Sequence, residues 1–146
     1  MSRFGIRQAA ASDLDSIFTF DHLAREDARH RAFVERSVRA GNCFVVEARD
    51  QVIGYGVLEY SFYQHGFVSM LYIAPDFRRQ GAGSILMRHF ESICQTDRLF
   101  TSTNLSNLPM QSLLAKLDYT LSGVIHHLDR DDPELVYVKF LRQDES

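Results

Sequence analysis

Apolar side chains recur at three- and four-residue spacing in four segments of the chain, which predicts four helices. The first helix starts after Ser12 or Asp13, either of which can cap it. Its apolar positions are Leu14, Ile17 and Phe18. The other three helices are expected over residues 25–40, 83–94 and 109–117.

Residues at the helix ends and along one helix face refine these expectations. The charged helix over 25–40 should end at Gly41, because glycine readily takes the left-handed conformation at a helix C-terminus. Pro109 suits the first turn of the last helix, where its missing N–H has no partner to lose. The helix over 83–94 should bury the stripe Leu86, Phe90 and Ile93.

Shorter runs of apolar or alternating residues predict strands, with polar turns between them. The strands are expected over residues 43–48, 52–60, 66–73, 99–103, 121–128 and 134–141, with connecting turns at 49–51, 61–65 and 129–133. The strand at 99–103 follows a strand and a helix, so it should return parallel. The pattern predicts an α/β (mixed α+β) fold whose sheet of about seven strands is mostly antiparallel and is flanked by about four helices.

Composition agrees with one compact domain over residues 1–146 in the cytoplasm. The chain is 45% hydrophobic and 24% charged, which suits a packed core. Its net charge of −3 gives no reason to expect nucleic acid binding. No run of apolar residues is long enough to span a membrane, and residues 1–20 lack the order of a secretory signal. Cys43 and Cys94 form no disulfide framework, so reduced thiols are expected.

Two arginines and two glycines stand where the strand at 66–73 gives way to the next helix. The segment reads Arg78, Arg79, Gln80, Gly81, Ala82, Gly83 and Ser84. The first N–H groups of a helix lack partners inside the helix and attract anions, and glycine lets the backbone approach one closely. A dinucleotide-binding turn would need a third glycine, and a Walker loop would need a Gly-Lys pair, which the chain lacks. The segment therefore predicts a phosphate-binding turn of another kind.

This turn resembles motif A of the GNAT superfamily of N-acetyltransferases, R/Q-x-x-G-x-G/A, which binds the pyrophosphate of acetyl-CoA. Arg78, Gly81 and Gly83 occupy its fixed positions. The preceding residues 71–75 match the family's strand end, L-x-V/I-x-P, and residues 6–9 with Asp13 and Leu14 look like its first strand and helix cap.

Residues 107–119 resemble motif B of the same family. The residues that match are Asn107, Leu113, Leu117 and Tyr119, whereas Met110, Leu114 and Asp118 depart from the motif. Because order and spacing agree at three separated places, the chain is identified as a member of this family.

The resemblance implies where acetyl-CoA binds. In the family, the strand ending at Ile73 and the one ending near Thr103 splay apart, and the pantetheine arm lies between them. The backbone of Leu71, Tyr72 and Ile73 would then contact the arm, and one N–H would polarise the thioester carbonyl. Asn107 would hold an amide of the arm, although it is equally suited to cap the helix before Pro109.

Catalytic groups follow from the proton balance of acyl transfer. An alkyl amine has a pKa of about 10.4, so a base that removes its proton assists the attack. Family positions that often carry the base are Phe67 and Ser69 here, and neither is basic. The candidates are Glu59 and then His65, each with the alternative of an ordinary exposed residue.

The acid that protonates the leaving thiolate is also open. The family's tyrosine is replaced by Leu114, so Tyr119 or Tyr72 is the nearest hydroxyl, unless the thiolate leaves unaided. Both tyrosines also suit the core or a pocket.

A small primary amine is the expected acceptor. The alternatives are a protein N-terminus or lysine, and a non-catalytic acyl-CoA sensor. A pocket from Tyr55, Tyr60, Phe62 and Tyr63 would favour small molecules, and the acidic tip at 129–134 could attract a cationic one or could be a solvated turn. The sequence does not indicate the oligomeric state; family members are commonly dimers, so the resemblance is compatible with a homodimer.

No metal site is expected. The six His form no metal signature with Cys. His126 and His127 are neighbours on an expected strand, so they would face opposite sides and could not bind one metal together.

Overall fold

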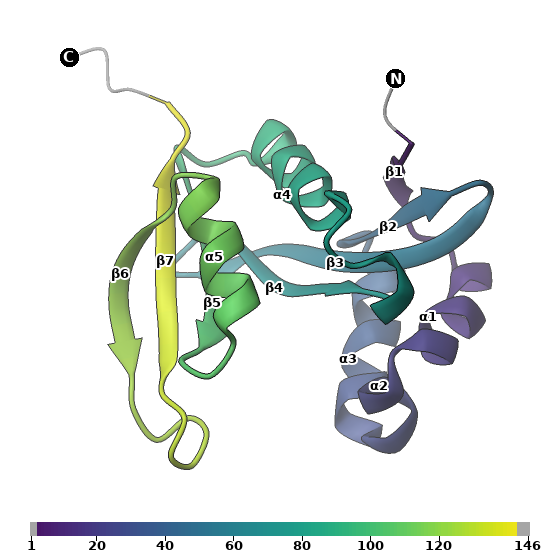
Figure 1. The fold of residues 1–146 in the computed structure, drawn as a ribbon, viewed down its shortest axis with the longest axis horizontal. Coiled ribbons are helices and arrows are strands. Elements are labelled where there is room, and N and C mark those ends of the chain that lie inside the picture. Colours follow the sequence, from purple (N-terminus) through teal and green to yellow (C-terminus); the bar gives the residue numbers. More distant parts are fainter. Residues whose placement is uncertain (1–2, 143–146) are drawn as a thin grey trace. The chain divides into compact units, whose positions relative to one another are not determined.

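The computed structural model describes residues 3–142, which form a seven-stranded mixed sheet in the order β1-β2-β3-β4-β5-β7-β6 (Figure 1). The strands are β1 (Gly5–Gln8), β2 (Cys43–Ala48), β3 (Gln51–Phe62), β4 (His65–Ile73), β5 (Arg98–Asn104), β6 (Thr120–Ile125) and β7 (Glu134–Phe140). The helices are α1 (Leu14–Phe20), α2 (His22–Glu26), α3 (Ala28–Arg39), α4 (Ala82–Ile93) and α5 (Leu108–Lys116). β4 and β5 run parallel, and the predicted fold class is confirmed.

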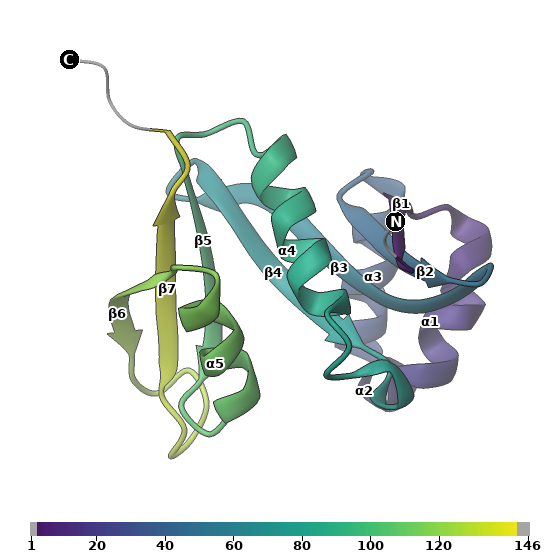
Figure 2. The same ribbon diagram turned by 45° about the horizontal axis from the view of Figure 1, so that its top comes forward.

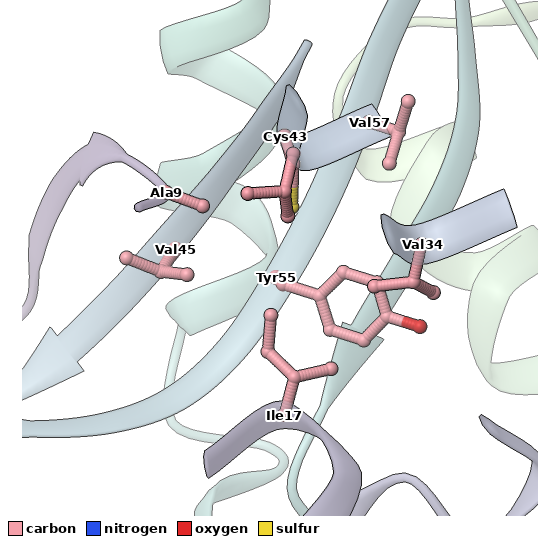
Figure 3. Packing of buried hydrophobic residues seen from close by; sticks show 8 residues of the cluster. Ala9, Ile17, Val34, Cys43, Val45, Tyr55 and Val57 are labelled. Atoms are coloured by element: carbon pink, nitrogen blue, oxygen red, sulfur yellow. The ribbon is translucent and has the colours of Figure 1, made fainter. Parts of the chain in front are cut away.

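The fold divides into two compact units. The first runs to Leu58 and also takes in Met70–His89. Its core gathers apolar side chains from α1, α3, β2 and β3 (Figure 3). The fully buried members include Ile17, Val34, Cys43, Val45, Tyr55 and Val57.

The second unit contains Glu59–Ser69 and the chain from Phe90 onward. There β4 pairs with β5 from Gly66–Leu99 to Val68–Thr101, and β7 lies antiparallel between β5 and β6. α5 lies against β5 and β7 in both views (Figures 1 and 2) and buries Leu114 and Leu117. The prediction of a single domain over residues 1–146 stays a prediction.

The single helix predicted over residues 25–40 is wrong, because Asp27 separates α2 from α3. Asp27 has extended backbone angles, φ −110° and ψ 110°, and its side chain accepts hydrogen bonds from the N–H groups of Arg29 and His30. An aspartate at this position satisfies two amides that would otherwise lack partners at the start of α3. The predicted end of α3 is correct, since Gly41 follows it with φ +78°.

The prediction that α4 buries Leu86, Phe90 and Ile93 is correct for the first two residues and wrong for Ile93. Ile93 is 37% exposed, whereas Leu86, Met87 and Phe90 are fully buried. Successive residues of a helix are rotated by about 100° around its axis. Because Met87 and Cys94 are buried as well, the buried side of the helix is centred away from Ile93.

The predicted strand 121–128 ends early. β6 stops at Ile125, and His127 has φ +70°, which no strand accommodates. The placement of His126 and His127 on opposite faces of a strand is therefore wrong.

Candidate active site

The predicted phosphate turn connects β4 to α4 as the sequence indicates. After β4 ends at Ile73, Pro75–Phe77 form a single 3-10 turn. The carbonyl of Gly81 accepts the N–H of Ile85 at 3.1 Å, so Gly81 stands at the start of α4. The N–H groups of residues 82–84 thus belong to the first helical turn, where amides have no partner inside the helix. This arrangement provides donors and a positive dipole end for an anion.

The backbone conformation at position 81 favours glycine. The φ of Gly81 is +91°, in the region that residues with a Cβ rarely adopt. A Cβ added there would meet no atom within 4 Å, so the space beside the backbone is open. Arg79 also has a positive φ, of 62°. Amides at a helix start with open space beside Gly81 suit a diphosphate, and these residues therefore fit acetyl-CoA.

Arg78 is held in position at the base of the turn. Its Nε donates to the carbonyl of Ile73 at 2.8 Å, and its guanidinium lies 5.2 Å from the ring centroid of Tyr72. Because the guanidinium carries five N–H donors in all, this bond leaves others suited to a phosphate. Gln80 is tied to the carbonyl of Asp76 at 3.2 Å. Arg78, Arg79 and Gln80 are exposed.

Leu71, Tyr72 and Ile73 are half-buried and lie at the end of β4, in the first unit. Tyr72 stacks on Phe20 with ring centroids 6.0 Å apart, and its hydroxyl donates to the carbonyl of Phe20 at 3.4 Å. Its side chain therefore packs the strand against α1. The backbone remains the part that the resemblance assigns to the pantetheine arm.

Asn107 is the N-cap of α5. Its Oδ1 accepts the N–H of Met110 at 3.2 Å, so the capping alternative is present in the structure. The bond uses only the oxygen of the side chain, and the amide nitrogen is a further donor. Asn107 and the phosphate turn belong to different compact units.

Glu59 is a half-buried carboxylate held by two serines of the second unit. The hydroxyl of Ser69 donates to its Oε2 at 2.8 Å, and that of Ser61 donates to its Oε1 at 2.5 Å. Two donated hydroxyls, one to each oxygen, fix the orientation of the carboxylate. Sequence reasoning set Ser69 aside because it is not basic and missed its contact with Glu59, which depends on the pairing of two strands.

His65, the second candidate base, begins β4. Its ring lies 5.8 Å from that of Phe100, and its Nδ1 is buried without a hydrogen-bond partner among the residues that the structure describes. The structure therefore packs His65 beside an aromatic ring, and no acidic side chain within residues 3–142 is hydrogen-bonded to its buried nitrogen.

Tyr119, the candidate acid, is 6% exposed in the second unit. Its hydroxyl donates to Glu91 Oε2 at 2.9 Å, and Lys139 donates to the other oxygen of Glu91 at 3.1 Å. The structure thus uses this hydroxyl to join α4 to the chain after α5. Leu114, at the family's tyrosine position, is fully buried.

The four aromatic residues whose closed pocket would favour small molecules do not form such a pocket together. Tyr55 is fully buried in the first core, where its hydroxyl donates to Asp21 at 2.5 Å, and burial together with this bond raises its pKa. Tyr63 is 83% exposed at the turn between β3 and β4. Neither ring can therefore line such a pocket. The reason is that Tyr55 packs among α1 and α3, which sequence spacing did not reveal.

Comparison with known proteins supports the acetyl-CoA assignment. Residues 7–119 match the model of the Acetyltransferase (GNAT) family, and the chain belongs to this family. It is an acetyltransferase that uses acetyl-CoA as the acyl donor. No curated protein sequence matches the chain.

Solved structures share the fold over nearly the whole chain. An acetyltransferase of the GNAT family from Bacillus cereus ATCC 10987 is 28% identical, with a TM-score of 0.88 and coverage of 95% of this chain and 98% of that one. YncA from Salmonella typhimurium, solved with its cofactor acetyl-CoA, is 16% identical with a TM-score of 0.75, covering 99% and 98%. The ribosomal-protein-S18-alanine N-acetyltransferase from Escherichia coli is 13% identical with a TM-score of 0.78, covering 97% and 96%.

Two further observations concern sites of other kinds. Within residues 3–142, no group of three or more His, Cys, Asp and Glu side chains is arranged to hold a metal ion. None of the helices over the same residues is long and apolar enough to cross a membrane.

Proposed function

We propose that this acetyltransferase transfers the acetyl group to a primary amine of a small molecule by direct attack in a ternary complex. The observation that carries the proposal is the half-buried Glu59 carboxylate, oriented by Ser61 and Ser69. Ser69 lies on β4, the strand whose end the resemblance assigns to the pantetheine arm. A carboxylate fixed beside this strand is suited to accept a proton from an amine.

The reaction forms a bond between the amine nitrogen and the acetyl carbon and breaks the carbon–sulfur bond of the thioester. One proton leaves the nitrogen, and coenzyme A leaves with its sulfur. The amides of residues 82–84 and the side chain of Arg78 hold the diphosphate, and the backbone of Leu71 and Ile73 positions the arm. Glu59 takes the proton from nitrogen, directly or through a water.

Direct transfer is supported by the state of the two cysteines. Cys43 is fully buried, and burial raises the pKa of its thiol to about 12. Cys94 is 2% exposed. A thiol must reach the donor to form a covalent acyl intermediate, and both thiols are buried. A ternary complex is therefore the simpler route.

Replacing Glu59 by Gln tests the role of the base. We expect kcat/KM for an amine acceptor to fall by about 10²- to 10⁴-fold at neutral pH, since general-base catalysis contributes that much. The residual activity should depend more steeply on pH, because only amine that is already deprotonated can then react. The measurement is a thiol-release assay across pH 6–10 with a panel of amines.

Glu35→Gln is the matched control, since Glu35 is a half-buried carboxylate on α3 in the other unit. It should leave the pH profile unchanged. Acetyl-CoA affinity should be equal in both variants. A Glu59→Gln enzyme with the wild-type profile would remove Glu59 from the mechanism.

A further inference from the structure

The sheet of the second unit has one buried face and one half-exposed face. Along β5, Leu99, Thr101 and Thr103 are buried, whereas the alternate residues Phe100, Ser102 and Asn104 are half-buried. Lys139, which pairs with Leu99 on the buried face, is bonded to Glu91 of α4. The end of α4 therefore packs on the buried face, and the alternation leaves Phe100 on the other.

Aromatic rings form a row across the half-exposed face. The strand register places Phe67 of β4 beside Phe100 of β5, and Phe100 opposite Val138 of β7. The ring of Phe62 stacks on Phe67 at 4.9 Å and lies 5.0 Å from that of Phe100. All these side chains are only half-buried, so the row presents apolar surface to solvent.

The Glu59 carboxylate lies next to this row. Ser69, which donates to Glu59, follows Phe67 by two residues on β4 and so shares its face. The face thus combines a fixed negative charge with adjoining aromatic surface, and both belong to the second unit. A cationic head with an apolar body is complementary to this combination.

We propose that the acceptor is a primary amine carried on an aryl or alkyl body, with its nitrogen at Glu59 and its body on Phe62, Phe67 and Phe100. The proposal rests on the proposed function and specifies its substrate class. The aromatic row selects the acceptor, whereas the Glu59 carboxylate takes its proton. Apolar surface accounts for preference among amines, because an amine lacking the body leaves the rings in contact with water.

The test compares acceptors that differ in their bodies. We expect the wild type to acetylate 2-phenylethylamine with a kcat/KM about 10- to 100-fold above that for ethanolamine, as burial of an aromatic side chain implies. Phe100→Ala should lower kcat/KM for 2-phenylethylamine by about tenfold, mainly by raising KM. The value for ethanolamine and the affinity for acetyl-CoA should change little. Phe100→Leu retains apolar bulk, so its kcat/KM for 2-phenylethylamine should lie between the values of the wild type and of Phe100→Ala.

Tyr137→Ala is the matched control, since Tyr137 pairs with buried Thr101 and so lies on the opposite face of the sheet. It should preserve the preference for the aryl amine. Calorimetric titration of 2-phenylethylamine into enzyme saturated with coenzyme A gives a readout without turnover, and binding should weaken in Phe100→Ala. Thermal melts show whether Phe100→Ala is folded. If it is not, the inference is tested by kcat/KM of Phe100→Leu and by the preference of the wild type for 2-phenylethylamine over ethanolamine.

Transfer to ethanolamine or 1,4-diaminobutane in preference to 2-phenylethylamine would overturn this inference and leave the proposed function intact. Preference for a peptide N-terminus would overturn both. Transfer to none of these amines, with acetyl-CoA bound, would overturn the proposed function as well.

Discussion

Asp13 shows how one side chain can stabilise several elements of the first unit. Its two oxygens accept from Arg7 of β1 at 2.8 and 2.9 Å, and one of them also accepts the N–H of Ala10 at 2.7 Å. Asp13 is 6% exposed. The hydrogen bonds from Arg7 hold the pKa of this carboxyl below its usual range. Sequence reasoning expected Ser12 or Asp13 to cap the first helix. Asp13 stands at the N-cap position of α1 but makes no side-chain cap bond to it, because its carboxylate is engaged by Arg7 and by the N–H of Ala10.

Replacing Asp13 by Asn should lower the free energy of unfolding at pH 7 by about 1.5–3 kcal/mol, the range for hydrogen bonds to charged groups. A carboxyl whose folded-state pKa is depressed stabilises the fold above its unfolded pKa, and this contribution is lost as pH falls through the folded value. The difference between wild type and variant should therefore shrink below about pH 4. Urea unfolding at pH 7, 4 and 3 measures it.

Asp15→Asn provides the comparison, because Asp15 is exposed in the first turn of α1. Its effect should stay within about 0.5 kcal/mol. An Asp13→Asn deficit that persists undiminished at pH 3 would contradict the role of the ion pair.

At the scale of elements, aspartates decide where the N-terminal helices begin. Asp21 accepts the N–H of Ala24 at 3.3 Å and precedes α2, and Asp27 does the same for α3 with bonds of 2.9 and 3.3 Å. Residues 25–31 are mostly charged, and no glycine or proline occurs between them and Gly41, which is why the sequence predicts one helix over 25–40. The side-chain caps make the break favourable, since they satisfy amides at each helix start.

Replacing Asp27 by Ala should therefore destabilise the protein by about 0.5–2 kcal/mol, whereas Asp27→Asn should retain most of the stability because asparagine caps nearly as well. Urea unfolding measures these differences, provided that the unfolding free energy depends on urea concentration with the same slope in each variant. Glu26→Ala, at the neighbouring exposed position within α2, should cost less. Equal stability of Asp27→Ala and the wild type would show that the cap contributes nothing to α3.

For the whole molecule, the strongest consequence of the phosphate turn is stabilisation by the acyl donor. A ligand that binds only the folded state adds about 2.7 kcal/mol to the unfolding free energy at 100 times its Kd. We expect acetyl-CoA to raise the midpoint of thermal unfolding accordingly. Gly81→Val should largely abolish this increase, because valine disfavours φ +91° and its side chain would occupy the open space at the turn.

Gly123→Val is the control, since a Cβ at Gly123 also meets no atom within 4 Å and Gly123 lies on β6, away from the turn in sequence. It should keep the full increase with acetyl-CoA. A Gly81→Val protein that folds and binds the donor as tightly as the wild type would refute the assignment of this turn.

Much of this architecture was predictable from local sequence. The strand at 43–48 has the predicted bounds, and the other predicted strands are recovered to within about three residues at each end. The turn between β4 and α4 was predicted because its chemistry depends on neighbouring residues, namely glycine at a positive φ and the free amides of a helix start.

The candidate catalytic groups were less predictable, since their partners lie far away along the chain. Glu59 meets Ser69 ten residues later, and Tyr119 meets Glu91 across 28 positions. Which side chains meet across a sheet depends on strand register, and a shift of one residue moves each side chain to the other face.

The sequence by itself therefore determined the order of the elements, the phosphate turn and the family. Only the tertiary structure decided that Ser61 and Ser69 orient Glu59, that Tyr119 is bonded to Glu91, and that Phe67 and Phe100 lie side by side. The physical reason is that backbone conformation is set largely by adjacent residues, whereas these contacts arise from packing and strand pairing between distant segments.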